Sequence, residues 1–160
     1  MRWFWIDRVT YLEKGKTARA VKNVSLAEEH LHDHFPGYPV MPQALMIEGM
    51  AQTGGILSGS ASDFQENIVL AKVSKATFHR LARPGDQMIF ESHLVDSGPS
   101  GYRAETRITV DGELAAESSM MFASIPVGPN GDNAFVFKEN LMALLRECPG
   151  FVPPPNSFGR

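Results

Sequence analysis

A single long apolar segment constrains this chain more than any other feature of its sequence. The run QALMIEGMAQTGGIL begins directly after Pro42, and it lacks the alternation of a strand. Its apolar residues lie around most of a helical wheel rather than on one stripe: Leu45, Met46, Ile47, Met50, Ala51, Ile56 and Leu57. Proline fits the first position of a helix, and a helix that is apolar nearly all round must be buried. The pattern therefore predicts one central, buried helix.

Extended segments stand on both sides of this helix in the sequence. Two precede it, WFWIDRVTYL and TARAVKNV, with a turn at Lys14-Gly15-Lys16. Four follow it: IVLAKVSKATFH, QMIFESHLVD, YRAETRITVD and ELAAESSMMFASI. Asp111-Gly112, between the last two, is the strongest hairpin signal in the chain. These segments predict an α+β fold in which an antiparallel sheet curls around the helix.

The length and the distribution of proline divide the chain unequally. A chain of 160 residues suits one domain, which we expect over residues 1–125. Six of the eleven prolines follow Ile125, so residues 126–160 are predicted to form a proline-rich extension outside the core. Phe137, Leu141, Leu144 and Leu145 fall at helical spacing, which predicts an amphipathic helix over 133–147 that packs on the domain or on a partner.

Charge and cysteine content argue against several classes of protein. The net charge of −3 argues against a surface that coats nucleic acid. The single cysteine, Cys148, cannot form an internal disulfide, so a cytoplasmic location is the simplest expectation. No segment is apolar over the length that a membrane span or a secretory signal needs.

Glu48 is the only charged side chain between Phe35 and Ala61, in the middle of the predicted buried helix. A buried carboxylate is unfavourable without a partner, and desolvation favours its protonated form, which can act as a general acid. A structural hydrogen bond or a solvent channel explains a lone buried glutamate equally well. Glu48 therefore becomes a candidate for catalysis only together with a second group.

A second group is available in the loop before the helix, where His30, His32 and His34 alternate. Histidines at this spacing can ligate a metal, but the only further histidines are His79 and His93, so we expect no metal site. The prolines after His34 fix its backbone and direct its ring toward the start of the helix. A neutral imidazole there is the natural base near physiological pH.

The stretch HFPGYPVMPQALMIEGMAQTGG, from His34 to Gly55, resembles the active-site segment of the β-hydroxyacyl-acyl-carrier-protein dehydratases of the FabA/FabZ type. Further segments resemble family segments in the same order: Ile6–Val9, Lys22–Ser25, Arg83–Gln87 and Val110–Glu117. The resemblance covers about residues 4 to 125.

This resemblance implies the hot-dog fold, with the helix after Pro42 inside the antiparallel sheet. It implies a homodimer, in some members a hexamer of three dimers, with each active site shared between two chains. His34 matches the catalytic histidine and Glu48 the catalytic acid. The substrate implied is a β-hydroxyacyl group on the phosphopantetheine of acyl carrier protein, in fatty-acid or related lipid or polyketide synthesis. The chemistry requires no metal and no organic cofactor.

The chain departs from the family pattern at positions that bear on substrate binding. Gln43 stands where the family has glycine after Met-Pro, and Val69 stands where some members carry an aromatic gate to the acyl tunnel. We therefore name Gly37, Gln43, Gln52 and Val69 as candidate substrate-binding residues. Lys72, Lys75, Arg80 and Arg83 lie in one segment without an acid among them, which predicts a positive patch for the acidic carrier protein.

Two other functions are compatible with the sequence. A hot-dog thioesterase or enoyl-CoA hydratase would act on coenzyme A esters, but such thioesterases generally lack the His-Phe-Pro-Gly loop. A non-catalytic acyl-binding or scaffold subunit would keep the loop while Gln43 prevents turnover. His34 favours the dehydratase.

Overall fold

The computed structural model describes residues 4–125 and 138–151, and of Lys138, Glu139 and Asn140 only the backbone. Six strands and three helices are assigned within these ranges. In chain order they are β1 (Arg8–Glu13), β2 (Thr17–Asn23), α1 (His30–Asp33), α2 (Gln43–Ala61), β3 (Asn67–Phe78), β4 (Gln87–Gly98), β5 (Gly101–Val110), β6 (Glu113–Ile125) and α3 (Lys138–Arg146). The predicted strands and the predicted central helix are all present.

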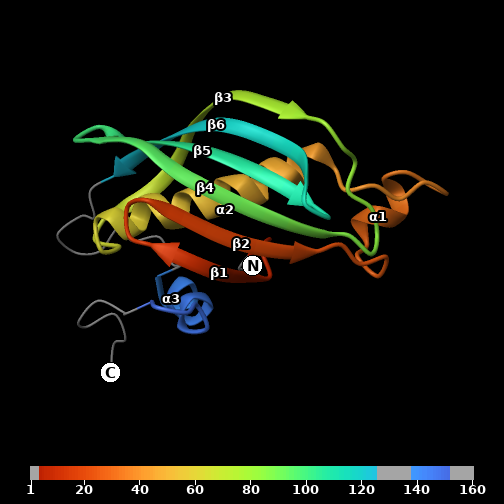
Figure 1. Ribbon diagram of the computed structural model, residues 1–160, viewed down its shortest axis with the longest axis horizontal. Coiled ribbons are helices and arrows are strands. Elements are labelled where there is room, and N and C mark those ends of the chain that lie inside the picture. The colour runs from red at the N-terminus through yellow and green to blue at the C-terminus, as the bar shows by residue number, and fades with distance from the viewer. Residues whose placement is uncertain (1–3, 126–137, 152–160) are drawn as a thin grey trace.

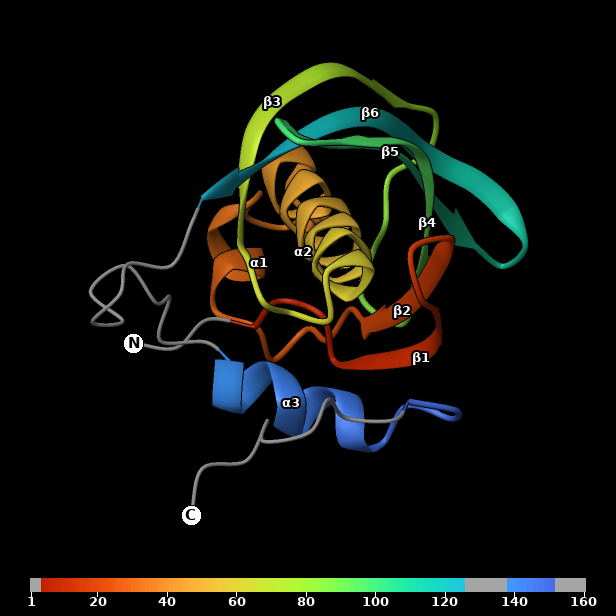
Figure 2. The same ribbon diagram turned by 90° about the vertical axis from the view of Figure 1, so that its left-hand side faces the viewer.

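The six strands form one antiparallel sheet with the order β1-β2-β4-β5-β6-β3. Figure 1 shows α2 lying along the concave face of this sheet, and Figure 2, viewed nearly along α2, shows the strands curving around it. The α+β class and the hot-dog arrangement are therefore confirmed. Curvature of this kind lets one sheet cover most sides of a single helix.

Two tight turns set the register of the hairpins. Gly15 adopts φ 64° between β1 and β2. Asp111 and Gly112 adopt φ 53° and 80° between β5 and β6, which is the pair of positive φ values that a two-residue hairpin loop requires. Both turns occur where the sequence predicts them.

Helix α2 fits inside the sheet because its glycines allow aromatic rings to approach closely. Met46, Met50 and Leu57 are at most 1% exposed. A Cβ atom on Gly49 would lie 2.4 Å from the ring of Phe90, and one on Gly54 would lie 2.8 Å from the ring of Phe122. These two phenylalanines come from β4 and β6, so the glycines let α2 lie directly against the middle of the sheet.

Strand β3 forms one edge of the sheet and is the least covered of the strands. It pairs only with β6, and none of its twelve residues is buried. An edge strand of this length presents a row of backbone N–H and C=O groups that another strand can pair with.

Residues 138–151 of the C-terminal extension contribute to the core, contrary to the expectation that the extension lies outside it. Helix α3 packs beneath β1, at the other edge of the sheet (Figure 2). Met142 and Leu145 are fully buried, and the ring of Phe151 meets that of Phe64 with centroids 6.2 Å apart. The predicted helix began at 133, but residues 133–137 lie outside the described residues. No described helix has the length and apolar character needed to cross a membrane.

Candidate active site

His34 lies at the end of a single helical turn that the sequence analysis expected to be loop. Helix α1 ends directly before it, and the His34 carbonyl accepts a hydrogen bond from Val40 N–H at 3.0 Å. The peptide bond between His34 and Phe35 is cis, and the two rings stack with centroids 4.2 Å apart. The His34 ring is partly exposed. Its backbone is therefore held on both sides while its ring stays accessible.

The loop after His34 closes on itself. The Phe35 N–H donates to the Tyr38 carbonyl at 3.1 Å, and the Tyr38 N–H donates to the Phe35 carbonyl at 2.8 Å. Gly37, between them, adopts φ 75°, and a Cβ there would touch nothing within 4 Å. Phe35 and Tyr38 are both about half exposed, at 53% and 48%. This short turn therefore presents two large aromatic side chains beside the histidine.

Glu48 is held in place by a neighbour one turn along α2. Gln52 Nε2 donates to Glu48 Oε1 at 2.8 Å, while Gln52 Oε1 accepts from the backbone N–H groups of Trp5 at 2.9 Å and Ile6 at 3.3 Å. The N–H groups determine which end of the Gln52 amide faces Glu48. The predicted substrate-binding residue Gln52 thus contacts the candidate acid directly, as residues four apart on a helix do.

His34 and Glu48 are not joined to each other within the chain. The described residues give no hydrogen bond or ion pair between them. His34 belongs to the loop after α1, whereas Glu48 is tied through Gln52 to the N-terminal segment before β1. The two candidate catalytic groups are thus supported by separate parts of the fold.

The N-terminus of α2 has no side-chain cap. Pro42 caps it without a side-chain hydrogen bond, and its first turn contains no acidic residue. The backbone N–H groups of a first helical turn have no partner within the helix and favour negative charge. Gln43 begins this turn with an exposed side chain. The other predicted substrate-binding residue, Val69, is partly buried on β3, where it pairs with Ala123.

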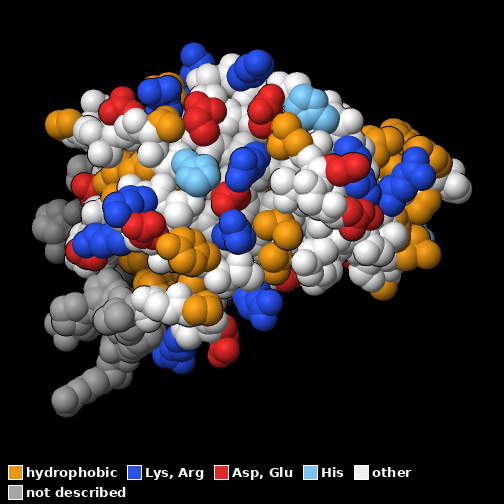
Figure 3. Space-filling view, in the orientation of Figure 1, with side chains coloured by type: hydrophobic (Ala, Val, Ile, Leu, Met, Phe, Trp, Pro, Cys, Tyr) orange, Lys and Arg blue, Asp and Glu red, His pale blue; other side chains and the backbone are white. Residues whose placement is uncertain are grey.

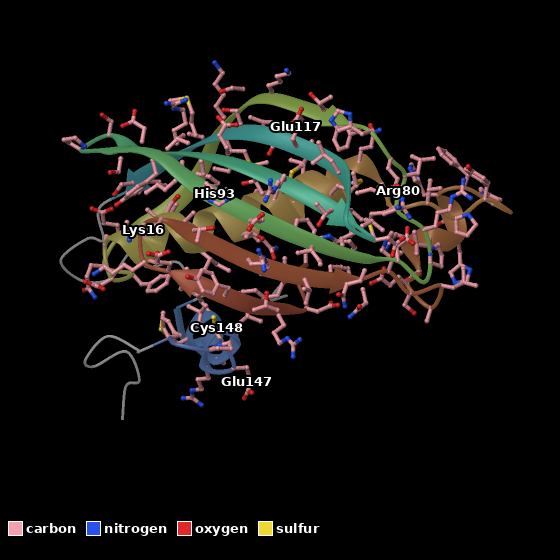
Figure 4. The ribbon with its side chains drawn as sticks, viewed as in Figure 1. Lys16, Arg80, His93, Glu117, Glu147 and Cys148 are labelled. Carbon is pink, nitrogen blue, oxygen red and sulfur yellow. The ribbon has the colours of Figure 1, made fainter. Side chains whose placement is uncertain are left out.

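The four predicted carrier-binding cations differ in their surroundings. Arg80 lies at the α1 end of the molecule (Figure 4) and pairs with Asp111 at 2.9 Å, Glu113 at 3.3 Å and Asp86 at 3.8 Å. The hydrogen bond to Asp111 raises the pKa of Arg80. Two acids that are distant in sequence, Asp111 and Glu113, and the nearby Asp86 thus neutralise this cation.

The other three cations form no ion pair among the described residues. Arg83 lies over the ring of Tyr38, 4.7 Å from its centroid, and its guanidinium donates to the Tyr38 hydroxyl. Lys72 and Lys75 are exposed on β3. A cavity of about 380 Å³ is lined by Arg80, Leu81, Arg83 and Asp86. The loop of His34 and the segment 79–86 therefore meet at one end of the molecule, and Met41 N–H fixes this contact by donating to the Ala82 carbonyl at 2.8 Å.

The remaining histidines do not form a cluster. His79 and His93 are exposed, and His93 lies on the outer face of the sheet (Figure 4). Among the described residues no three His, Cys, Asp or Glu side chains are grouped so that they could hold a metal. Figure 3 shows acids and bases interspersed over the outer face rather than one basic surface. His30 is partly buried and packs against Trp5 with ring centroids 5.3 Å apart.

Comparison with known proteins identifies the family of this chain, and a separate comparison with solved structures identifies its fold. The FabA-like domain family matches residues 3–119. A 3-hydroxyacyl-acyl-carrier-protein dehydratase FabZ from Pectobacterium atrosepticum is 45% identical over 121 residues, which cover 74% of this chain and 80% of the relative. A FabZ of the same description from Nitratiruptor is 37% identical over 122 residues, covering 72% of this chain and 82% of the relative.

Solved structures show the same fold at low sequence identity. A Streptococcus mutans protein bound to acetyl CoA aligns with TM-score 0.65 and 15% identity, covering 79% of this chain and 94% of that one. A chain of a dehydratase heterocomplex from Xenorhabdus doucetiae aligns with TM-score 0.60 and 14% identity, covering 77% and 99%.

Proposed function

The chain belongs to the FabA-like family and is a β-hydroxyacyl-acyl-carrier-protein dehydratase of fatty-acid biosynthesis, and we propose that His34 is its catalytic base and Glu48 its catalytic acid. The single observation that carries this assignment is the placement of Glu48. It is the only charged side chain of α2, and Gln52 holds its carboxyl from the same helix. Dehydration requires a general base and a general acid, and a histidine and a carboxylic acid can fill these two roles.

The proposed reaction transfers two protons. His34 removes the proton from the carbon next to the thioester carbonyl. As the carbon–carbon double bond forms, the bond between the β carbon and its hydroxyl breaks, and Glu48 gives its proton to the departing oxygen, so that water leaves. The product is the trans-2-enoyl thioester. Transfer of the proton from the His34 imidazolium to the Glu48 carboxylate then restores both groups, and hydration is the same sequence reversed.

Negative charge develops on the thioester oxygen as the α proton leaves. The N-terminus of α2 supports a role for its backbone N–H groups in stabilising this charge, because no side chain caps it and its first turn contains no acid. Gln43 carries one of these N–H groups. Its exposed side chain can stand beside the bound thioester without removing that donor.

We propose further that the active site is shared between the two chains of a homodimer, joined along β3. Support comes from the free edge of β3, from the absence of buried residues along it and from the exposed Phe35 and Tyr38 beside His34. A two-fold axis at this edge would continue the sheet from one chain into the other. His34 of one chain would then serve Glu48 of its partner, and three such dimers would make the predicted hexamer.

Acyl carrier protein is the partner that this function implies, and we place its contact at Lys72, Lys75 and Arg83. These cations have no ion-pair partner among the described residues, whereas Arg80 is engaged by three acids. Carrier proteins are acidic, so positive charge near the loop of His34 would guide them to the site. A cytoplasmic location stays a prediction.

The experiment that tests the assignment measures enoyl absorbance on a β-hydroxyacyl-carrier substrate. His34→Ala and Glu48→Gln should each lower kcat by about 10²-fold to 10⁴-fold, as expected for loss of a general base or acid. Full activity in both variants would overturn the mechanism. Hydrolysis of the thioester, or activity confined to coenzyme A esters, would favour the thioesterase or hydratase. Activity that appears only in Gln43→Gly would favour the scaffold subunit.

A further inference from the structure

Lys22 is buried, unlike every other charged side chain whose burial the structure describes. It lies near the end of β2 and is 6% exposed. Its Nζ lies 2.5 Å from Glu28 Oε1, 3.5 Å from Asp7 Oδ1 and 4.5 Å from the centroid of the Trp5 ring. An ammonium group is very unfavourable inside a protein without such partners. The ion pair with Lys22 therefore holds the Glu28 carboxylate in one position.

Glu28 stands at the start of the turn that leads to His34. Its N–H donates to the Ser25 carbonyl and its own carbonyl accepts from Leu31 N–H, both at 3.0 Å. Helix α1 follows two residues later and ends at Asp33, directly before His34. Figure 1 shows how the C-terminal end of β2 leads to α1. Between Glu28 and His34 the only regular structure is α1, which has four residues.

A helix of one turn has no stability of its own, because nucleation costs more than one turn of hydrogen bonds returns. The position of α1 is therefore set by its tertiary contacts. Leu31 supplies one, as it is 1% exposed. The other is the packing of His30 against Trp5, and His30 Nε2 lies 3.7 Å from Glu28 Oε2. Neither of these two buried atoms has a hydrogen-bond partner among the described residues, so Glu28 is held through Oε1.

We propose that the ion pair between the buried Lys22 and the partly buried Glu28 positions His34 for catalysis. The pair fixes the start of α1, and the bond from Val40 N–H fixes the His34 carbonyl on the other side. Lys22 and Glu28 do not touch the substrate. They are positioning residues, and the inference rests on the proposed role of His34. A displacement of about 1 Å at a catalytic group can cost about 10²-fold in rate, so a small shift of α1 is enough.

Mixed dimers test this placement against a general loss of stability. One chain carries His34→Ala and the other Glu48→Gln, so the one complete site takes His34 from the second chain and Glu48 from the first. Glu28→Gln is then introduced into either chain. Each mixed dimer contains one copy of Glu28→Gln, so an effect on folding is the same in both.

The proposal predicts an asymmetric result. Glu28→Gln on the chain that supplies His34 should lower kcat by about 10²-fold with little change in KM. The same substitution on the chain that supplies Glu48 should lower the rate far less, because the His34 that it would displace is already absent. Equal losses in both arrangements, or no loss in either, would overturn the proposal.

Two further variants keep the outcome interpretable. Glu29→Gln neutralises the exposed neighbouring acid and should have no effect in either chain. If Glu28→Gln chains fail to fold, the pair Lys22→Met with Glu28→Gln leaves no unpaired buried charge and should show the same asymmetry. If the parent mixed dimer is inactive, the shared site is wrong. The test is then made on homodimers that carry a single substitution. A loss of kcat in Glu28→Gln that is absent in Glu29→Gln still requires the positioning role.

Discussion

Gln52 holds Glu48 by a hydrogen bond of 2.8 Å, while the backbone of Trp5 and Ile6 holds Gln52. The only charged side chain of α2 is thus oriented by the segment that precedes β1. This relationship connects the candidate acid to residues more than 40 positions away, since Trp5 and Gln52 are 47 residues apart. The N-terminal segment is therefore part of the support of the active site.

Replacing Gln52 should separate its two hydrogen-bonding roles. Gln52→Leu removes both, so kcat should fall, and the free energy of unfolding should drop by about 1–3 kcal/mol because two N–H groups lose their acceptor. Gln52→Glu keeps the acceptor but places a second carboxyl beside Glu48. It should lower kcat with a smaller loss of stability. Steady-state kinetics and urea unfolding of both variants check this, and an unchanged kcat in Gln52→Leu would contradict it.

Reversing the charge of Lys72 and Lys75 together should weaken carrier recognition. We expect KM for the acyl-carrier substrate to rise by about tenfold, with KM for a small acyl thioester unchanged, because only the carrier is guided by the field. The matched control reverses Lys14 and Lys16, which lie in the β1–β2 turn, with Lys16 at the opposite end of the molecule from Arg80 (Figure 4). A similar rise in KM in that control would show a net-charge effect instead.

Two glycines of α2 should respond oppositely to alanine. Gly49→Ala places a Cβ 2.4 Å from the ring of Phe90 and should destabilise the protein by about 1–3 kcal/mol. At Gly55 the nearest atom, on Phe122, lies at 3.7 Å, an ordinary contact. Gly55→Ala should therefore stabilise the helix by about 0.4–1 kcal/mol, because the unfolded chain loses freedom. Thermal unfolding of the two variants measures the difference, and destabilisation of equal size would refute it.

Glu91 should contribute stability that disappears in acid. The hydrogen bond from Arg19 at 2.7 Å, together with Arg107, holds the pKa of Glu91 below its ordinary value, although desolvation acts in the opposite direction. Because the folded-state pKa is the lower one, the stabilisation is present above the unfolded-state pKa of about 4.3 and is lost as the pH falls through the folded-state pKa.

Glu91→Gln should accordingly be less stable than the parent protein at neutral pH, and the two should converge below about pH 4. Urea unfolding across this range is the measurement. Asp96→Asn, an exposed acid on the same strand, is the matched control. A stability difference between Glu91→Gln and the parent that does not vary with pH would show that the ion pairs are not responsible.

Local sequence patterns predicted the helices, strands and turns well, because the formation of these elements depends on residues that are neighbours in the sequence. The helix after Pro42, the Gly15 turn and the Asp111-Gly112 turn each follow from conformational preferences of a few residues, and all three are confirmed. The pairing of a base with an acid was also predicted from residue types, and the roles of His34 and Glu48 stay proposals. The helical turn before His34 was missed, since a single turn carries no periodicity.

The tertiary structure decided what depends on residues that are distant along the chain. The sequence gives no signal that β3 lies at an edge next to β6, because the order of strands depends on where the chain returns after α2. Only Asp86 is an acid close to Arg80 in sequence, yet the β5–β6 hairpin also brings Asp111 and Glu113 to it. The burial of Lys22 likewise depends on Trp5 and Asp7, which reach it from the segment before β1. Sequence alone thus determined the kinds of groups present, and folding determined which of them are paired, because pairing depends on distance in space.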